Sequence, residues 1–285
     1  MKPRFIAEVS SNHNRDLERA LAFVDAAAEV GCDAVKFQLF RVDELFAPEI
    51  VQRSEAVRAR REWELPLDFL PAIAEQCRDR GIQFMCTPFY LDAVTELESF
   101  VTAYKVSSYE LLWDELLVAC ARTGKPVILS TGMATLDEVS HAVEVLRAYR
   151  VSELTLLHCV SKYPAPAEEC NLSVIQTLRE EFGCRVGWSD HSVNAGVVHR
   201  AINRWGADTV EFHFDLDSEG EEFSGGHCWL PSSARQLIAD CKSGFSADGS
   251  GEKRPAPSES DERMWRADPQ DGLRPVKSIR DDWRP

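Results

Sequence analysis

Short apolar runs of strand character alternate with segments of helical spacing along most of the chain. The strand-like runs lie at residues 5–9, 34–40, 84–87, 103–106, 127–130, 154–160, 186–189 and 209–214. The helix-like segments lie at residues 17–30, 66–80, 91–98, 113–123, 136–149, 172–182, 193–205 and 232–245. Eight strand–helix units over about 245 residues predict an α/β fold, the TIM (βα)8 barrel. The alternative, a doubly wound open sheet, is less favoured because no glycine-rich phosphate-binding turn follows the first strand.

Two segments fall outside the eight units. Residues 41–65 form a long, charged connection after the second strand, and such connections often border the catalytic face of a barrel. Residues 246–285 are polar, and their first part, 246–262, has the composition of a disordered linker. We therefore predict a barrel domain at residues 1–245, followed by a polar linker and tail at residues 246–285.

The balance of charge excludes two classes of partner. The chain holds 32 lysines and arginines against 47 aspartates and glutamates, a formal net charge of −15. Without a basic excess, we expect no binding to nucleic acid or to an anionic membrane. A local cluster of lysines can still bind a small anionic substrate.

Cysteine usage and the N-terminus indicate the compartment. Nine cysteines, an odd number, occur without a CxxC pair, which is typical of reduced thiols in a cytoplasm. The sequence opens directly on a strand-like run rather than on an apolar signal segment, and no run is long enough to cross a membrane. These features predict a cytoplasmic protein.

Two histidines follow neighbouring strands in the stretch 186–214. His191 comes just after one strand and His213 near the end of the next, with one helix between them. In a parallel βαβ unit both strand ends open on the same face, so the two imidazoles can share one cation. The alternative is that one histidine is a core residue and the other a surface residue.

Two lysines lie on separate strands of the predicted barrel. As unpaired charges, Lys36 and Lys105 would be costly in its interior, so an anionic ligand gives both a role. Hydroxyl groups that can donate to the same ligand stand at the ends of other strands, at Thr87, Ser108, Ser130 and Ser189. The alternative is that each lysine pairs with a nearby carboxylate, such as Glu8 or Glu110.

Carboxylates at strand ends complete this chemistry. Glu8, Glu110 and Glu211 can transfer protons beside a cation and an anionic substrate. This combination fits metal-assisted aldol-type condensation and metal-assisted hydrolysis alike. Hydrolysis is less favoured, because two histidines alone are a thin ligand shell for a hydrolytic zinc.

Eight motifs occur in order along the barrel and carry a family resemblance. They are IAEVSSNHN, AVKFQLF, FMCTPF, YKVSSYE, KPVILSTGMAT, HCVSKYPAP, GWSDHS and EFHF. Together they resemble the barrel domain of the N-acetylneuraminate (sialic acid) synthase family, from residue 5 to about residue 230. The resemblance implies a carbon–carbon bond-forming transferase that condenses phosphoenolpyruvate with the aldehyde of an amino sugar and releases phosphate. It also implies a divalent metal, manganese or magnesium, and a homodimer.

The resemblance implies roles for individual positions. His191 and His213 match metal ligands, and Glu8 matches a carboxylate near the reacting aldehyde. The residues that match the phosphoenolpyruvate site are Lys36, Thr87, Lys105, Ser108, Ser130 and Ser189. The residues that match sugar contacts are Gln38, Glu110 and Tyr163, and Ser161 stands where the family has asparagine or serine. We take the catalytic set to be Glu8, Lys36, Lys105 and Glu211, and the other residues outside the metal pair to bind substrate.

The chain departs from the family pattern on the sugar side. Phe212 stands where the family usually has lysine, and residues 221–229 lack the aspartate of the family's Gly-Pro-Asp-His motif. We do not expect the family's C-terminal antifreeze-like domain within residues 246–285. The substrate is therefore an amino sugar or a related aldose, and the alternative function is a non-catalytic or regulatory barrel that binds metal and anion.

The tail carries a second hypothesis. Residues 264–284 contain apolar anchors at Trp265, Leu273, Val276, Ile279 and Trp283, and arginines at positions 266, 274 and 280. We hypothesise that this segment folds over the barrel mouth and brings a guanidinium to the substrate. The alternative is a disordered terminus.

Overall fold

Eight parallel strands close into a barrel in sequence order, with β1 paired to β8. The strands are β1 (Arg4–Glu8), β2 (Ala34–Leu39), β3 (Gln83–Pro88), β4 (Ala103–Val106), β5 (Val127–Ser130), β6 (Leu154–His158), β7 (Arg185–Asp190) and β8 (Thr209–His213). This structure is a computed structural model that describes residues 2–281. The predicted TIM barrel is confirmed.

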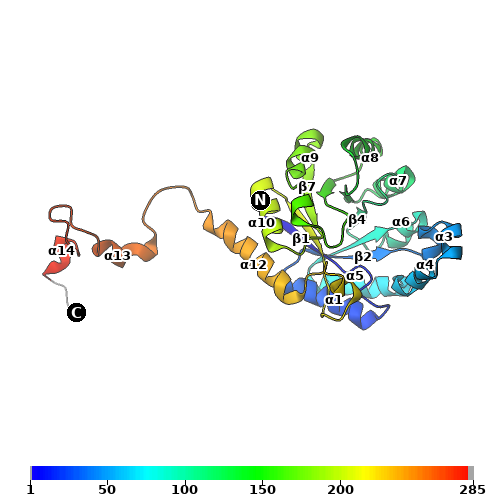
Figure 1. Ribbon diagram of the computed structural model, residues 1–285, viewed down its shortest axis with the longest axis horizontal. Helices are drawn as coiled ribbons and strands as arrows, with labels where there is room; N and C mark the ends of the chain where they lie inside the picture. The colour runs from blue at the N-terminus through cyan, green and yellow to red at the C-terminus, as the bar shows by residue number, and fades with distance from the viewer. Residues whose placement is uncertain (1, 282–285) are drawn as a thin grey trace. The chain divides into compact units, whose positions relative to one another are not determined.

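A helix follows each strand and covers the outside of the barrel (Figure 1). These helices are α1 (Leu17–Val30), α5 (Leu70–Arg80), α6 (Leu91–Leu97), α7 (Asp114–Arg122), α8 (Leu136–Ala148), α9 (Val174–Phe182), α10 (Ala195–Trp205) and α12 (Pro231–Ala247). Local sequence sets their ends: Asp16 caps α1, Thr135 and Glu138 form a capping box at α8, and Gly31 ends α1 at φ 94°. Within residues 2–281, none of the helices is long and apolar enough to span a bilayer.

The barrel interior consists of an apolar floor and a polar layer above it. The floor is a cluster of six buried side chains, Ile6, Ala34, Met85, Ala103, Ile128 and Leu157. Because side chains alternate along a strand, the residue two positions further on points to the same side. Those residues are Glu8, Lys36, Thr87, Lys105, Ser130 and Cys159, and all are buried. The strand period therefore gathers predicted site residues at the carboxyl ends of the strands.

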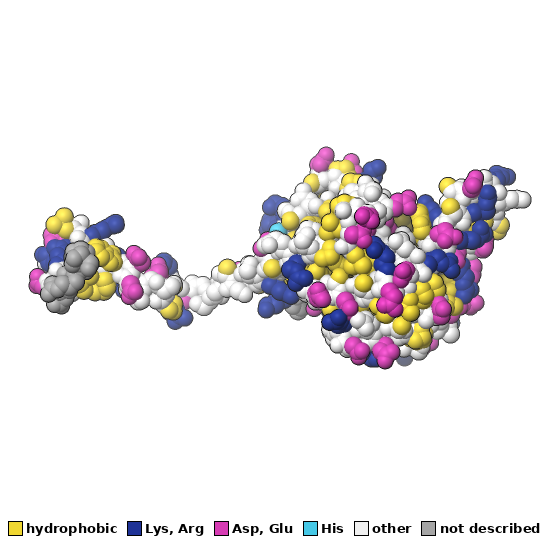
Figure 2. Space-filling view, turned by 90° about the horizontal axis from the view of Figure 1, so that it is seen from below, with side chains coloured by type: hydrophobic (Ala, Val, Ile, Leu, Met, Phe, Trp, Pro, Cys, Tyr) yellow, Lys and Arg dark blue, Asp and Glu magenta, His cyan; other side chains and the backbone are white. Residues whose placement is uncertain are grey.

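The long connection after β2 folds as a small helical insert. It holds α2 (Val42–Leu45), α3 (Pro48–Arg53), α4 (Glu55–Ala59) and the 3-10 turns η1 (Arg60–Trp63) and η2 (Leu67–Phe69). Phe40, Val42 and Val51 form a separate apolar cluster against partly buried neighbours that include Phe46 and Trp63. Figure 2 shows basic side chains gathered on the right, where Figure 1 has α3 and α4. The insert is thus a packed element with its own small core.

The chain divides into two compact units, Met1–Lys242 and Ser243–Pro285. The second unit contains η4 (Pro257–Glu259), α13 (Ser260–Met264) and α14 (Lys277–Arg280), so helical turns occur where the composition predicted a disordered linker. Asp268 accepts from the backbone N–H groups of Gln270 and Lys277, and Arg280 pairs with Asp271 within the unit. One predicted anchor, Trp283, lies outside the described residues.

Candidate active site

Two lysines and two carboxylates form a buried quartet in the polar layer. Lys36 Nζ lies 2.7 Å from Glu8 Oε2 and 3.3 Å from Glu211 Oε2. Lys105 Nζ lies 3.9 Å from Glu211 Oε1. None of the four is more than 5 % exposed. The two ammonium groups therefore converge on one carboxylate, and the ion pairing considered as an alternative from the sequence is present between Lys36 and Glu8.

Burial and charge oppose each other in this quartet. Burial acts to raise the pKa of Glu211, but Lys105 and Lys36 outweigh it and lower that pKa to about 2. Burial lowers the pKa of Lys105, and Glu211 compensates only in part. Burial also acts to lower the pKa of Lys36, yet Glu211 and Glu8 together raise it above its ordinary value. Of the two lysines, Lys105 therefore loses its proton more easily.

Hydroxyl groups contact both sides of the quartet. Thr87 Oγ1 lies 3.4 Å from Lys36 Nζ, and Ser189 Oγ donates to Glu211 Oε1 at 3.1 Å. Ser130 is 3 % exposed, and its alternation with Ile128 on β5 places it in the same layer. The predicted hydroxyl donors on β3, β5 and β7 thus lie in the layer that holds the two lysines.

Gly132, just beyond β5, brings the backbone close to three side chains. Its N–H donates to Ser108 Oγ at 2.9 Å, and Ser108 Oγ lies 3.3 Å from Cys159 Sγ. A Cβ atom at position 132 would lie 2.9 Å from both of these atoms and closer still to Ser161 Oγ. Ser161 Oγ is buried and has no hydrogen-bond partner among the described residues, so its hydroxyl can bind a ligand. Glycine at 132 therefore lets the backbone pass close to these three polar side chains, which any larger residue would displace.

The residues predicted to contact the sugar lie in different settings. Gln38 Nε2 donates to Glu8 Oε1 at 2.7 Å and so orients that carboxylate. Glu110 accepts from Ser107 Oγ rather than pairing with a lysine, and burial raises its pKa. Tyr163 is 36 % exposed, and its ring centroid lies 4.2 Å from that of His191. Gln38 and Tyr163 therefore border the quartet and the histidines, respectively.

Four potential metal ligands lie together at and beyond the end of β8. One donor atom from each of His213, Glu222, His227 and Cys228 lies within 4.8 Å of the others. Glu222 Oε2 is central: it lies 2.9 Å from His213 Nδ1, 3.5 Å from Cys228 Sγ and 3.7 Å from His227 Nε2. Imidazole, carboxylate and thiolate are all ligands for divalent metals in proteins. The donor set fits a divalent metal, and we call it the His–Glu–His–Cys group.

Electrostatics within this group favour a cation. Burial acts to raise the pKa of Glu222, but His213 outweighs it and lowers that pKa to about 2. Burial acts to lower the pKa of His213, but Glu222 raises it above its ordinary value. Glu222 is therefore a carboxylate near neutral pH, and a metal ion competes with a proton for His213.

His191 lies beside the His–Glu–His–Cys group. Its ring centroid is 5.5 Å from that of His213, and its Nδ1–H donates to Val160 O at 2.7 Å. Burial, followed by the charge of His213, lowers the pKa of His191 to about 3, so its imidazole is neutral. A neutral ring held by a backbone carbonyl is typical of metal-binding histidines. The role of His191 as a ligand remains a prediction.

Sequence reasoning missed three of the four donors, and all three lie in the segment that follows β8. Glu222 lies in α11 (Glu221–Ser224), and His227 and Cys228 precede Trp229, which bridges to Phe214. Trp229 N donates to His213 O at 2.8 Å, so this segment returns to the end of the strand. The spacing EEFSGGHC, with carboxylate, imidazole and thiol within seven residues, is the signal that could have identified it.

Asp190, at the end of β7, holds this returning segment in place. Its carboxylate is 0 % exposed and accepts from the indole N–H groups of Trp188 and Trp229, each at 3.0 Å. It also accepts from Ser192 Oγ at 2.6 Å. One buried carboxylate thus links β7 to the chain next to His227 and Cys228, a role that the sequence analysis did not assign.

Comparison with known proteins agrees with the barrel fold and identifies the family of the chain. Residues 23–253 match the NeuB family. The chain is 37 % identical over 266 residues to the protein MJ1065 of Methanocaldococcus jannaschii, covering 91 % of this chain and 76 % of that one. It is 35 % identical over 272 residues to N,N'-diacetyllegionaminic acid synthase of Legionella pneumophila, covering 89 % of this chain and 75 % of that enzyme.

The chain also resembles a solved structure of this family in its three-dimensional fold. The N-acetylneuraminic acid (sialic acid) synthetase of Leptospira borgpetersenii, in complex with citrate, aligns with a TM-score of 0.80 and 31 % identity. The alignment covers 91 % of this chain and 90 % of that one. The family resemblance inferred from eight motifs is confirmed. The protein is a carbon–carbon bond-forming transferase, and the chain belongs to the NeuB family.

Proposed function

We propose that this protein condenses phosphoenolpyruvate with the aldehyde of an amino sugar or a related aldose. The enol carbon attacks the aldehyde carbon, water adds to the resulting cationic carbon, and the intermediate loses phosphate to give a keto sugar acid. The observation that carries the proposal is the convergence of Lys36 and Lys105 on Glu211 in a buried layer. Buried ammonium groups at the end of a barrel match an anionic substrate such as phosphoenolpyruvate.

The two lysines have different capacity to bind a ligand. Lys36 uses its three N–H donors on Glu8, Glu211 and Thr87, at 2.7, 3.3 and 3.4 Å. Lys105 makes one short contact, to Val106 O at 3.0 Å, and lies 3.9 Å from Glu211. We therefore assign anion binding mainly to Lys105, and assign to Lys36 the role of fixing the two carboxylates. The proposed hydroxyl donors to the same anion are Thr87, Ser108, Ser130 and Ser161, while Ser189 uses its one donor on Glu211 and orients that carboxylate.

Glu8 is the proposed proton-transfer group for the aldehyde oxygen. Its Oε1 atom accepts from Gln38 Nε2 at 2.7 Å and from Ser10 N at 3.1 Å, while Oε2 faces Lys36. A carboxylate held on both oxygens has a fixed orientation, which general acid–base catalysis requires. Glu211 remains ionised beside both lysines and favours their charged forms while the anion enters and leaves.

The proposed metal ligands are His213 together with Glu222 and His227, and His191 is retained from the sequence prediction. A divalent metal bound there supplies Lewis-acid polarisation of a substrate oxygen. The chain's own residues provide the remaining functions, which are anion binding, orientation and proton transfer. The family resemblance predicts manganese or magnesium, and the choice of ion depends on the donor set.

The proposed substrate class follows the printed names of the relatives. Those names refer to N,N'-diacetyllegionaminic acid and to N-acetylneuraminic acid, both of which carry N-acetyl groups. An N-acylated amino sugar is therefore the proposed aldose. We further propose that residues 1–245 are the catalytic domain, that residues 246–285 are an appendage, and that the protein acts as a cytoplasmic homodimer.

The proposal is tested with the full chain by measuring phosphate release. Phosphoenolpyruvate, each of a panel of N-acylated and unsubstituted aldoses, and the two substrates together are incubated with enzyme and a divalent metal. We expect phosphate release only with both substrates, and a product whose mass equals their sum plus water minus phosphoric acid. Phosphate release from phosphoenolpyruvate alone would contradict the proposal. Tight anion binding without turnover on any aldose would instead favour the non-catalytic barrel.

A further inference from the structure

Cys228 has polar neighbours, although it is a buried thiol. It is 4 % exposed, and its Sγ lies 3.5 Å from Glu222 Oε2 and 3.7 Å from Asn12 Nδ2. A buried cysteine otherwise behaves as a small apolar side chain packed among others. Here the surroundings are a carboxylate, an amide and two imidazoles, which are metal ligands and their supports rather than a hydrophobic core.

The position of Cys228 is fixed by both of its neighbours. His227 belongs to the same group of donors, and Trp229 is held to β8 through its backbone and to Asp190 through its indole N–H at 3.0 Å. The sulfur atom is therefore held beside His213 by contacts that do not involve the thiol itself. This preorganisation is the property that a metal ligand needs.

We propose that Cys228 is itself a metal ligand, and that it makes the His–Glu–His–Cys group select a borderline ion such as zinc, cobalt(II) or iron(II) over magnesium or manganese. Thiolate is a soft ligand and favours these ions, whereas magnesium and manganese favour oxygen ligands. The inference rests on the proposed function for the need of a metal, but it takes the donor set from the structure. It replaces the manganese or magnesium expected from the family resemblance.

Charge balance supports a thiolate in this position. On metal binding the S–H bond breaks, a metal–sulfur bond forms, and the proton leaves to solvent. The thiolate and the Glu222 carboxylate together then carry two negative charges, which balance a divalent ion in this partly buried site. Without the thiolate, one carboxylate and two neutral imidazoles would leave one positive charge of the same ion uncompensated by the group.

Cobalt(II) provides a direct spectroscopic test. The full chain is stripped with a chelator and titrated with cobalt(II) alone, and we expect a sulfur-to-cobalt charge-transfer band in the near ultraviolet. Cys228→Ser should lose this band. Cys241→Ser is the matched control, because Cys241 is also buried beside a histidine, with its Sγ 3.5 Å from His199 Nδ1, but has no place in the group of four. The control should keep the band.

Metal competition measures the selectivity. Zinc binds most nitrogen and oxygen sites more tightly than manganese, so the informative quantity is the change in the zinc-to-manganese affinity ratio on mutation. We expect Cys228→Ser to lower that ratio by about 10- to 100-fold in equilibrium dialysis. Circular dichroism checks that each variant is folded.

Two results would overturn the inference. One is stoichiometric cobalt binding by the wild-type chain without a charge-transfer band, which needs no variant to interpret. The other is an unchanged affinity ratio in folded Cys228→Ser. Failure of the proposed function would look different: the band and the ratio would behave as expected, but no metal would support phosphate release from phosphoenolpyruvate with any aldose.

Discussion

The two halves of the candidate site are built from different parts of the fold. The lysine–carboxylate quartet lies entirely on strands, with Glu8, Lys36, Lys105 and Glu211 on β1, β2, β4 and β8. The His–Glu–His–Cys group has one member on a strand, His213, and three in the segment that follows it. Strand positions are fixed by the hydrogen-bonded register of the barrel, whereas the positions in that segment depend on tertiary contacts. The quartet should therefore respond to loss of charge, and the metal half also to loss of its supports.

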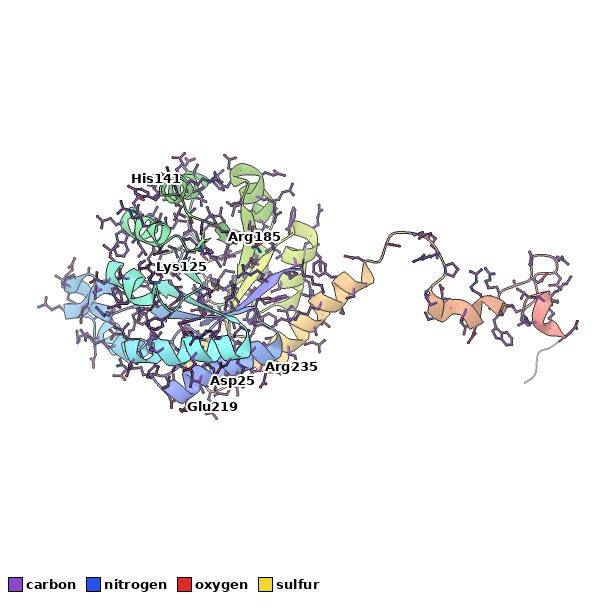
Figure 3. The ribbon with its side chains drawn as sticks, turned by 180° about the vertical axis from the view of Figure 1, so that it is seen from behind. Asp25, Lys125, His141, Arg185, Glu219 and Arg235 are labelled. Carbon is purple, nitrogen blue, oxygen red and sulfur yellow. The ribbon has the colours of Figure 1, made fainter. Side chains whose placement is uncertain are left out.

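The largest loss of activity is expected from a change in the lysine–carboxylate quartet. Lys105→Met keeps the length of the side chain but removes the ammonium group with spare hydrogen-bonding capacity, so kcat/KM for phosphoenolpyruvate should fall by about 1,000-fold or more. Lys125→Met is the control: Lys125 donates to Val101 O at 2.8 Å just before β5 and is labelled in Figure 3. Equal losses in both variants would show that the effect is structural.

The second prediction compares the contributions to catalysis of two imidazoles, that of His227 in the segment after β8 and that of His213 on the strand. His213→Ala and His227→Ala should each lower kcat by roughly 100-fold and weaken binding of a divalent metal, measured by isothermal titration. His141→Ala is the control, because His141 lies on α8 and pairs with Asp114 at 2.9 Å (Figure 3). If His227→Ala binds metal like the wild type, the returning segment is not part of the metal site.

A change at Asp190 tests whether this residue holds the segment that carries His227 and Cys228 in place for metal binding. Asp190→Asn weakens the acceptor shared by the indoles of Trp188 and Trp229, so metal affinity should fall by about 10-fold while the affinity for phosphoenolpyruvate stays unchanged. Asp25→Asn, on α1 and labelled in Figure 3, is a control at an ion pair outside the barrel mouth. A parallel loss of both affinities would mean that Asp190 supports the whole fold rather than one half of the site.

A smaller effect is expected on the pH dependence of folding stability, through Glu211 of the quartet. The folded pKa of Glu211, about 2, lies below its ordinary 4.5, so its ionised form stabilises the fold. This contribution is fully present above pH 4.5 and is lost as the pH falls towards 2. The urea midpoint of the wild-type chain should drop across that window, and Glu211→Gln should show a smaller drop. Matching profiles for the two proteins would contradict the assigned pairing.

The smallest effect is expected from the tail. Deletion from Arg263 onward should raise the Michaelis constant of the aldose by a few-fold and leave phosphoenolpyruvate affinity unchanged, if the tail covers the barrel mouth. Arg280 is engaged by Asp271 within its own unit, and Arg266 Nε donates to Arg263 O there at 2.9 Å. Unchanged kinetics for both substrates would show that the tail has no part in catalysis.

The contrast between the halves also explains what the sequence could predict. Apolar–polar alternation along β1, β2 and β4 places Glu8, Lys36 and Lys105 two residues beyond floor residues, so their convergence follows from the strand period alone. The same pattern does not reveal that Glu211, rather than Glu110, is the carboxylate shared by the lysines. That choice depends on the pairing of β7 with β8 and on Ser107, which engages Glu110 instead.

Residues 214–229 could not be placed from the sequence, because they show no period that fixes the direction of their side chains. Their path depends on the Phe214–Trp229 bridge, on Asp190 and on the ion pair between Arg19 and Asp215 at 2.9 Å. These contacts join residues that are distant in sequence or follow no repeating spacing. His227 and Cys228 are therefore recognisable as candidate metal ligands only in the folded structure.

The apolar floor has a consequence for the order of events. Its side chains, from Ile6 to Leu157, are packed and buried, so the polar layer is closed on the side of the floor. Both reactants must enter, and both products must leave, through the same rim. Whatever binds next to Lys105 is covered by whatever binds after it. The expected kinetics are therefore sequential and ordered, with the anion entering first and the aldose second.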